Sequence, residues 1–154
     1  MLELKSEYLF DVHADLREAI QVGATPAGQR VIADVTGGRI EGRVTGTLLP
    51  SGADWLIIGG DGCGRIDVRA AARLDDGSVL YMTYNGRLFI PPEIAPKVMN
   101  RATVEQVDPS SYYFRVAPTY ETASTQYAWL NRIQALGIGR MTKTGVAYKI
   151  YEIK

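Results

Sequence analysis

Carboxylates and arginines recur beside aromatic residues in this sequence, and such groups are suited to moving protons. The candidate catalytic residues are Glu41, Asp54, Asp67 and Arg69. A carboxylate desolvated against an indole ring, as Asp54 would be beside Trp55, has a raised pKa and can exchange a proton near neutral pH. The pattern therefore predicts general acid–base chemistry on a small organic molecule, with Asp54 or Glu41 as the acid–base residue.

Residues that would bind the substrate are expected on several other strands. They are Trp55, Tyr81, Asn85, Arg115, Glu121 and Trp129. Arg69 or Arg115 would hold a substrate carboxylate or stabilise a developing enolate, and the aromatic rings would form pocket walls. Plainer interpretations stand beside these: Asp67 and Arg69 as a solvated ion pair, and Trp55 as part of the core.

Other kinds of site are not indicated by the residue spacing. The glycines of residues 36–42 precede no predicted helix, so they do not suggest a phosphate-binding loop. His13, the single histidine, lacks the neighbours of a catalytic triad. Cys63 is the single cysteine, which excludes an intrachain disulfide and a Cys/His zinc cluster. We therefore expect a protein without a cofactor or a metal.

The composition limits the partners that the protein is expected to have. The chain has 154 residues, which fits a single domain over residues 1–154. Its 17 basic and 17 acidic residues balance, so nucleic acid and anionic membranes are not expected partners. The sequence has no apolar run of membrane-spanning length and no signal-peptide pattern, which predicts a cytoplasmic location. Weak charge repulsion and exposed strand edges favour a homodimer.

Polar and apolar residues alternate along residues 39–49, 65–74 and 79–90, which predicts β-strands. Further strands are predicted at 3–12, 30–35, 54–58, 112–120, 131–138 and 146–153, with a loop at 23–30, a strand or helical turn at 16–22, and helical turns at 93–100 and 126–130. Short strands without repeated strand–helix units are typical of antiparallel all-β folds. The sequence predicts one antiparallel β-barrel of about eight to ten strands, with one or two short helical turns.

A predicted turn at residues 50–52 separates the two candidate acid–base residues. If strand 39–49 pairs with strand 54–58 through this turn, Glu41 and Asp54 face one pocket. Glycines at positions 42 and 46 would bend the first of these strands, as closure of a barrel requires. Which face of each strand lies inside the barrel stays open, because both faces carry small or aromatic residues.

Six segments resemble, in order and spacing, the DUF3237 family, also called UPF0311. They read VGATPAGQRVIADVTGGRIEG, LLPSGADWLI, IDVRAAARLDDGSVLYM, NGR, YYFRVAPTYETASTQYAWLNR and VAYKIYEI. The family pattern falls on Gly37, Gly38, Glu41, Gly42, Gly52, Asp54, Asp67, Arg69, Asp76, Gly77, Arg115, Glu121, Tyr127, Trp129, Leu130 and Asn131. The resemblance implies a single antiparallel β-barrel and no settled reaction. It also implies that residues 91–111 vary in length, as a lid over the barrel mouth would.

Two main classes of function are open at this point, and a purely structural role in an oligomer is a third option. The first is a cofactor-independent enzyme, an isomerase, cyclase, lyase or hydrolase, acting on a small organic acid, an aromatic breakdown product or a polyketide-like compound. The second is a binding module that holds a small hydrophobic or aromatic ligand without chemistry, as other closed barrels do. Conversion of a bound ligand would separate the two classes.

Overall fold

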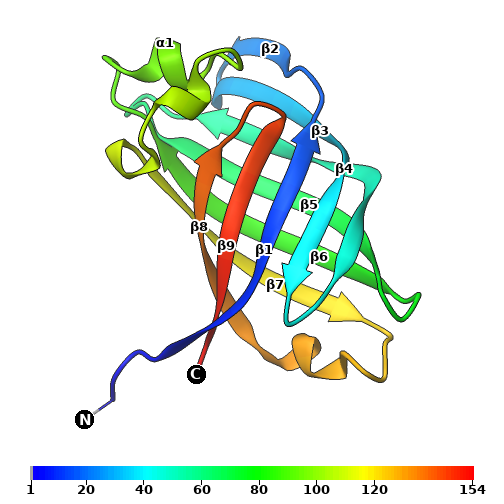
Figure 1. Ribbon diagram of the computed structural model, residues 1–154. Helices are drawn as coiled ribbons and strands as arrows, with labels where there is room; N and C mark the ends of the chain where they lie inside the picture. Colours follow the sequence, from blue (N-terminus) through cyan, green and yellow to red (C-terminus); the bar gives the residue numbers. More distant parts are fainter. Residues whose placement is uncertain (1) are drawn as a thin grey trace.

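Eight antiparallel strands close a barrel in the computed structural model, which describes residues 2–154 (Figure 1). The strands are β1 (Ser6–Leu16), β3 (Gly28–Gly42), β4 (Gly46–Ile58), β5 (Gly64–Leu74), β6 (Val79–Phe89), β7 (Tyr113–Thr122), β8 (Gln134–Met141) and β9 (Gly145–Ile153). Their order is β1-β9-β8-β7-β6-β5-β4-β3, and the pairing of β1 with β3 closes the ring. The predicted all-β antiparallel barrel is confirmed.

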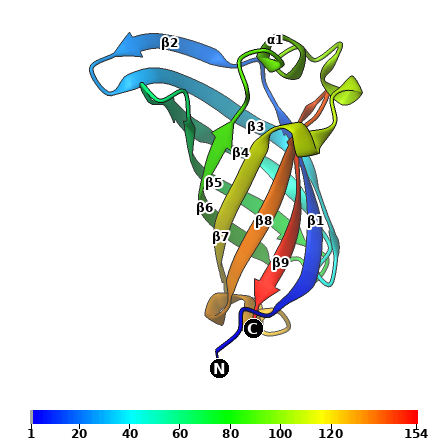
Figure 2. The same cartoon turned by 90° about the vertical axis from the view of Figure 1, so that its left-hand side faces the viewer.

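A ninth strand, β2 (Ile20–Thr25), extends β3 beyond the ring as a hairpin at the mouth of the barrel (Figure 2). The loop predicted at 23–30 is therefore wrong. Of the two alternatives for 16–22, the strand is confirmed in part, because β2 begins at Ile20, and the helical turn is wrong. The turn formers there make a tight hairpin turn instead of a long loop. The Thr25 hydroxyl donates to the carbonyl of Gly28 at 2.9 Å and accepts from the amide of Ala27 at 3.2 Å.

The turn predicted at residues 50–52 is a bulge inside β4, and the chain reverses at 43–45 instead. Leu48 lies opposite Ala72 and Gly52 opposite Ala70, so four positions on β4 span what two span on β5. The bulge lets a long strand bend around the barrel, and Pro and Gly are tolerated at such irregular positions. Strand 39–49 is consequently split between β3 and β4.

The apolar faces of the strands point into the barrel. On β5, Ile66 and Val68 are 3% and 2% exposed, whereas Arg65 and Arg69 on the opposite face are exposed. The core continues around the ring through side chains such as Phe10, Phe114 and Ile150. Burying each large apolar side chain contributes about 1.5–3 kcal/mol, which fixes the alternation and therefore the side on which polar residues lie.

Short helices cover the two ends of the barrel (Figure 2). At the mouth lie α1 (Ala95–Val98), η1 (Val104–Gln106) and η2 (Pro109–Ser111), and at the other end η3 (Ala128–Arg132). The helical turns predicted at 93–100 and 126–130 are confirmed in α1 and η3. Leu130 of η3 is fully buried in the core, so η3 closes the end where both chain termini lie. No helix within residues 2–154 is long and apolar enough to cross a membrane.

Side-chain hydrogen bonds hold the closed end together. The Asn131 amide takes the place of a strand neighbour for Thr122, accepting from its amide at 2.7 Å and donating to its carbonyl at 2.9 Å. Asp76 accepts from the Ser124 hydroxyl, and this contact lowers the pKa of the Asp76 carboxyl. Asp76 and Asn131, both part of the family pattern, therefore make structural contacts away from the barrel mouth.

Candidate functional site

A cavity of about 490 Å³ opens at the mouth of the barrel, beneath the segment that contains α1. Its walls are mainly apolar and include Val31, Leu56, Ile66, Leu88, Phe114 and Val146. Concave apolar sites of this size, with a few polar groups, are typical places for small ligands. The cavity is therefore the candidate site, and its polar groups define the chemistry available there.

Asp54 is the carboxylate that lies against the apolar walls of this cavity. It lies opposite Ala33 on β3 and Val68 on β5, on the face of β4 that points inward. Alternation along β4 then places Trp55 outside and Leu56 inside. Asp54 is thus held by a paired strand and not by a loop, which fixes its position in the barrel.

The pairing of β4 with β5 is interrupted beside Asp54. Asp54 lies opposite Val68, and regular pairing resumes with Ile57 opposite Arg65. Between them, the backbone amide of Asp67 donates to Oδ1 of Asp54 at 3.1 Å. The carbonyl of Trp55 accepts from the Arg30 guanidinium at 2.7 Å. The Asp54 carboxylate therefore accepts a hydrogen bond from a backbone amide that does not pair with β4. This bond orients the carboxylate and leaves its second oxygen free for other partners.

Burial raises the pKa of Asp54 from its ordinary 3.8 to about 6. The hydrogen bond from the Asp67 amide opposes this shift, and the negative charge of the Asp67 side chain adds to it. A carboxyl group with a pKa near 6 exists in both protonation states close to neutral pH. It can therefore act as a general base or a general acid there.

Two tyrosines, Tyr84 and Tyr148, lie deeper in the barrel. Asp54 on β4 pairs with Val68 on β5, which in turn pairs with Tyr84 on β6. The rings of Tyr84 and Tyr148 meet edge to face, with centroids 5.5 Å apart, and Tyr148 meets Phe114 at 5.3 Å. Burial raises the pKa of both phenols, and the Asp54 charge adds to the rise. Both hydroxyls are therefore neutral donors throughout the physiological range.

Charged side chains gather at the rim of the cavity, where Arg17, Glu18 and Arg101 line its opening. Nη2 of Arg101 donates to the carbonyl of Leu16 at 2.7 Å and so ties the segment after α1 to the end of β1. Arg17 lies 3.8 Å from the Asp34 carboxylate, an exposed and weak ion pair. The cavity thus has an apolar wall, one inner carboxyl group and a charged opening.

The expectation that Glu41 and Asp54 face one pocket is wrong. Glu41 lies on the outer face of β3, where its carboxylate pairs with Arg39 at 2.9 Å. Asp67 and Arg69 also lie on the outer face, because the residues that alternate with them, Ile66, Val68 and Ala70, point inward. Of the four predicted catalytic residues, Asp54 has its side chain in the cavity, and Asp67 contributes its backbone amide.

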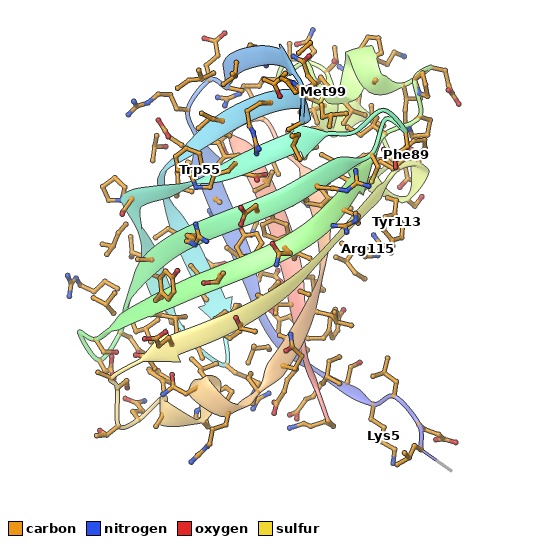
Figure 3. The ribbon with its side chains drawn as sticks, turned by 180° about the vertical axis from the view of Figure 1, so that it is seen from behind. Lys5, Trp55, Phe89, Met99, Tyr113 and Arg115 are labelled. Carbon is orange, nitrogen blue, oxygen red and sulfur yellow. The ribbon has the colours of Figure 1, made fainter. Side chains whose placement is uncertain are left out.

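The predicted substrate-binding residues lie away from the cavity walls. Trp55, Tyr81, Asn85, Arg115 and Glu121 are on the outer faces of β4, β6 and β7, as Figure 3 shows for Trp55 and Arg115. The Arg115 guanidinium lies 4.7 Å from the centre of the Tyr113 ring. Trp129 belongs to η3 at the closed end, with the Arg43 guanidinium 4.9 Å from its ring centre. The prediction that these residues form the pocket walls is therefore wrong for the mouth cavity. The apolar faces of the strands point inward instead, and they form its walls.

Sequence reasoning missed the residues at the mouth, including Arg17, Glu18, Met99 and Arg101. Met99, labelled in Figure 3, follows α1 at the upper end of the barrel. One signal pointed there, since residues 91–111 were expected to form a lid of variable length. Arg17 and Glu18 belong to no recognisable motif. They lie in the connection between β1 and β2, which reaches the rim only in the folded chain. Residues 2–154 contain no cluster of three or more His, Cys, Asp or Glu side chains suited to a metal ion.

The model of a protein family described as "Protein of unknown function (DUF3237)" matches residues 4–153. The chain belongs to the DUF3237 family. A UPF0311 protein of Clostridium acetobutylicum is 34% identical over 98% of this chain and 95% of its own length. The crystal structure of a protein of unknown function from Rhodopseudomonas palustris has a TM-score of 0.90 at 28% identity, and each chain is covered completely.

A protein of lower sequence identity also shares the fold of this DUF3237 chain. A crystal structure from Penicillium herquei, described as that of an enzyme, has a TM-score of 0.72 at 22% identity, covering 100% of this chain and 97% of that one. This likeness shows a common fold. The family assignment thus confirms the resemblance seen in the sequence motifs, and it assigns no reaction.

Proposed function

We propose that this DUF3237 protein is a cofactor-independent enzyme that moves a proton on a small organic molecule bound in the mouth cavity. The observation that carries the proposal is Asp54, a carboxyl group set into an apolar wall with a pKa of about 6. An isomerisation, cyclisation, elimination or hydrolysis could each use such a group.

In the simplest reaction of this kind, the Asp54 carboxylate removes a proton from a carbon beside a carbonyl group. The electron pair of the broken C–H bond forms a carbon–carbon double bond, and the π pair of the carbonyl group moves onto its oxygen, which gives an enolate. The Asp54 carboxylic acid then returns the proton to another atom of the same molecule, so the overall step is an isomerisation. The fixed hydrogen bond from the Asp67 amide holds the carboxyl group in place through both steps.

The test is deuterium exchange in heavy water. Small carbonyl compounds, aromatic acids and polyketide-like acids are incubated with the protein, and mass spectrometry follows deuterium uptake and conversion. Asp54→Asn is expected to lower the rate by about 10²-fold or more, and the wild-type rate should rise with pH through about 6. Asp11→Asn is the matched control, since Asp11 accepts one hydrogen bond on the outer face of β1. Equal rates for the wild type and Asp54→Asn would contradict the proposal.

The alternative is a binding module, and the apolar character of the cavity walls favours it as a second candidate. Such a protein would retain a ligand and return it unchanged. Recovery of a tightly bound compound without deuterium uptake would select this alternative over the enzyme.

We also infer a cytoplasmic homodimer. The free thiol of Cys63 suits a reducing compartment. Large apolar side chains on the outer surface, including Leu136 and Ile138, are 44% and 50% exposed and would be covered by a second subunit. Light scattering on the purified protein tests the dimer, and a monomeric mass would contradict it.

A further inference from the structure

The mouth cavity is polar at its opening and apolar in its depth. Arg17, Glu18 and Arg101 surround the opening, whereas Leu88 and Phe114 belong to the walls inside. A ligand that matches this arrangement has one charged end and one apolar end. The remaining questions are the sign of the charge and the direction in which such a ligand enters.

The sign follows from the charges that are free at the rim. Within residues 2–154, none of the ion pairs includes Arg101, and its one hydrogen bond goes to a backbone carbonyl. A guanidinium has five donors, so most of the Arg101 donors remain for a ligand. Arg17 adds a second cation that is only loosely shared with Asp34, at 3.8 Å. Among the side chains that line the opening, two arginines stand against the one carboxylate of Glu18, and Asp34 lies outside this lining, so the rim favours an anion.

The direction of entry follows from the inner carboxyl group. A second negative charge placed beside Asp54 would be repelled and would lose its hydration against apolar walls, both of which are unfavourable. An anionic group is therefore best placed at the rim, where water and the arginines solvate it. The apolar part of the same molecule then reaches the depth at which Asp54 can contact it.

We propose that the ligand of the mouth cavity is a small hydrophobic carboxylate, bound with its apolar body inside the barrel and its carboxylate at the rim on Arg101 and Arg17. This inference rests on the proposed function, because it names the substrate class of the same site. Arg101 follows α1, whose residue Val98 also lines the cavity. Holding the carboxylate therefore also holds the segment that covers the mouth.

Glu18 is the selective element of the rim in this proposal. Its carboxylate lines the same opening and opposes binding of an anion, so it lowers affinity for molecules with additional negative charges. Removal of this charge is expected to change affinity in the direction opposite to removal of Arg101. Opposite effects from neighbouring positions are difficult to obtain from a general loss of structure.

The experiment compares two probes of equal shape, naphthoate and its neutral amide, naphthamide. Dissociation constants are measured by calorimetry on the full chain, at a pH well above the pKa of Asp54. The wild type is expected to bind naphthoate about tenfold more tightly than naphthamide, as one charge-assisted contact provides. Arg101→Met should remove most of this preference without changing naphthamide binding, and Arg101→Lys should retain part of it.

Two further variants complete the test. Glu18→Gln is expected to tighten naphthoate binding by about two- to fivefold and to leave naphthamide unchanged. Arg87→Met is the matched control, because Arg87 is an exposed arginine on the outer face of β6, and it should alter neither affinity. Thermal melting of each variant shows that it is folded.

Each failure has its own meaning. Equal affinity of the wild type for both probes would overturn the carboxylate class and leave the proposed function standing. A preference for naphthoate that survives in Arg17→Met, Arg101→Met and the double variant would overturn the rim assignment. Absence of binding of either probe, together with absence of deuterium exchange in any compound tested, would overturn the proposed function as well.

Discussion

Asp54 illustrates how one side chain serves chemistry at a cost to the fold. Its carboxyl group is set among apolar residues and keeps one backbone donor, the Asp67 amide. A carboxylate in these surroundings is poorly solvated, and this is the reason that its pKa is raised. The same raised pKa makes the stability of the protein depend on pH.

We expect Asp54→Asn to be more stable than the wild type at alkaline pH. The folded-state pKa of about 6 lies above the ordinary 3.8, so the favourable contribution is complete below 3.8 and is lost as the pH rises through about 6. Asparagine stays neutral and can still accept from the Asp67 amide. At pH 8 the gain in unfolding free energy should be on the order of 1–3 kcal/mol.

Urea unfolding at several pH values checks this prediction. The difference between Asp54→Asn and the wild type should shrink steadily as the pH is lowered from about 7 to about 4. In Asp11→Asn the hydrogen bond from Tyr8 can be retained on the outer surface, so this control should show no such trend. A difference that is constant over this pH range would mean that Asp54 is not desolvated in the folded protein.

At the scale of elements, the bulge of β4 decides how the strand carrying Asp54 bends around the barrel. Gly52 has φ of +92°, and a Cβ at this position would lie 1.9 Å from the Arg69 carbonyl oxygen. Only glycine fits both conditions. The bulge therefore depends on this one residue, because the backbone of the paired strand β5 at Arg69 and Ala70 leaves no room for a side chain.

We expect Gly52→Ala to lower the free energy of unfolding by about 2–5 kcal/mol, through backbone strain and the clash with β5. Gly60→Ala is the matched control, since Gly60 lies in a turn with open space around its Cα, and its effect should be close to zero. Denaturant melts of both variants provide the comparison. Similar stabilities would show that β4 can bend without the bulge.

A row of like charges crosses the outer faces of β5, β6 and β7. Arg65 lies opposite Arg87, and Arg87 lies opposite Arg115. Like charges directly opposite each other destabilise a sheet, whereas opposite charges contribute up to about 1 kcal/mol for each pair. The middle position of the row therefore faces two unfavourable neighbours at once.

Arg87→Glu is expected to stabilise the protein by a few tenths to about 1 kcal/mol, because both neighbouring pairs become attractive. Arg87→Gln removes the charge without reversing it and should give a smaller gain. Thermal unfolding at low and high salt tests the cause, since screening should reduce the gain of the charge reversal. A gain that is unaffected by salt would point to a cause other than charge.

The strand pattern could be predicted from the sequence, and the position of the site could not. Alternation along residues 65–74 gave the strand and its two faces, but the small residues on both faces left the inner side undecided. The Pro and Gly of residues 50–52 indicated a turn, because their local preferences are the same in a turn and in a bulge. Asp54 was identified as a candidate, whereas Arg101 reaches the rim only through contacts distant in sequence.

At the scale of the whole molecule, the chain enters β1 beside its C-terminal residue, near the closed end of the barrel, and the residues before Lys5 project away from it (Figure 1). The amide of Lys154 donates to the carbonyl of Lys5 at 2.9 Å, and the Lys154 ammonium pairs with Glu7 at 2.7 Å. A short linker can therefore connect the ends without rearranging a strand. This arrangement predicts that the order of strands along the chain can be changed while the barrel is kept.

We expect a circular permutant that is joined between residues 154 and 5, and opened at Gly60, to fold into the same barrel and bind the same probes. Opening at Asp76 is the control and should cost more stability, because Asp75 and Asp76 hold Tyr127 and Ser124. Circular dichroism, thermal melting and naphthoate binding compare the two. Failure of both permutants would show that strand order is needed for folding.

Placing β1 between β3 and β9 also has a consequence for how the protein is made. On a ribosome, β1 can pair with β3 early, but its second edge must wait for β9, which follows all the other strands in sequence. The nascent chain is therefore an open sheet with two free edges, which are sites for pairing with other chains. The second edge of β1 should thus stay unpaired until β9 arrives and the ring closes.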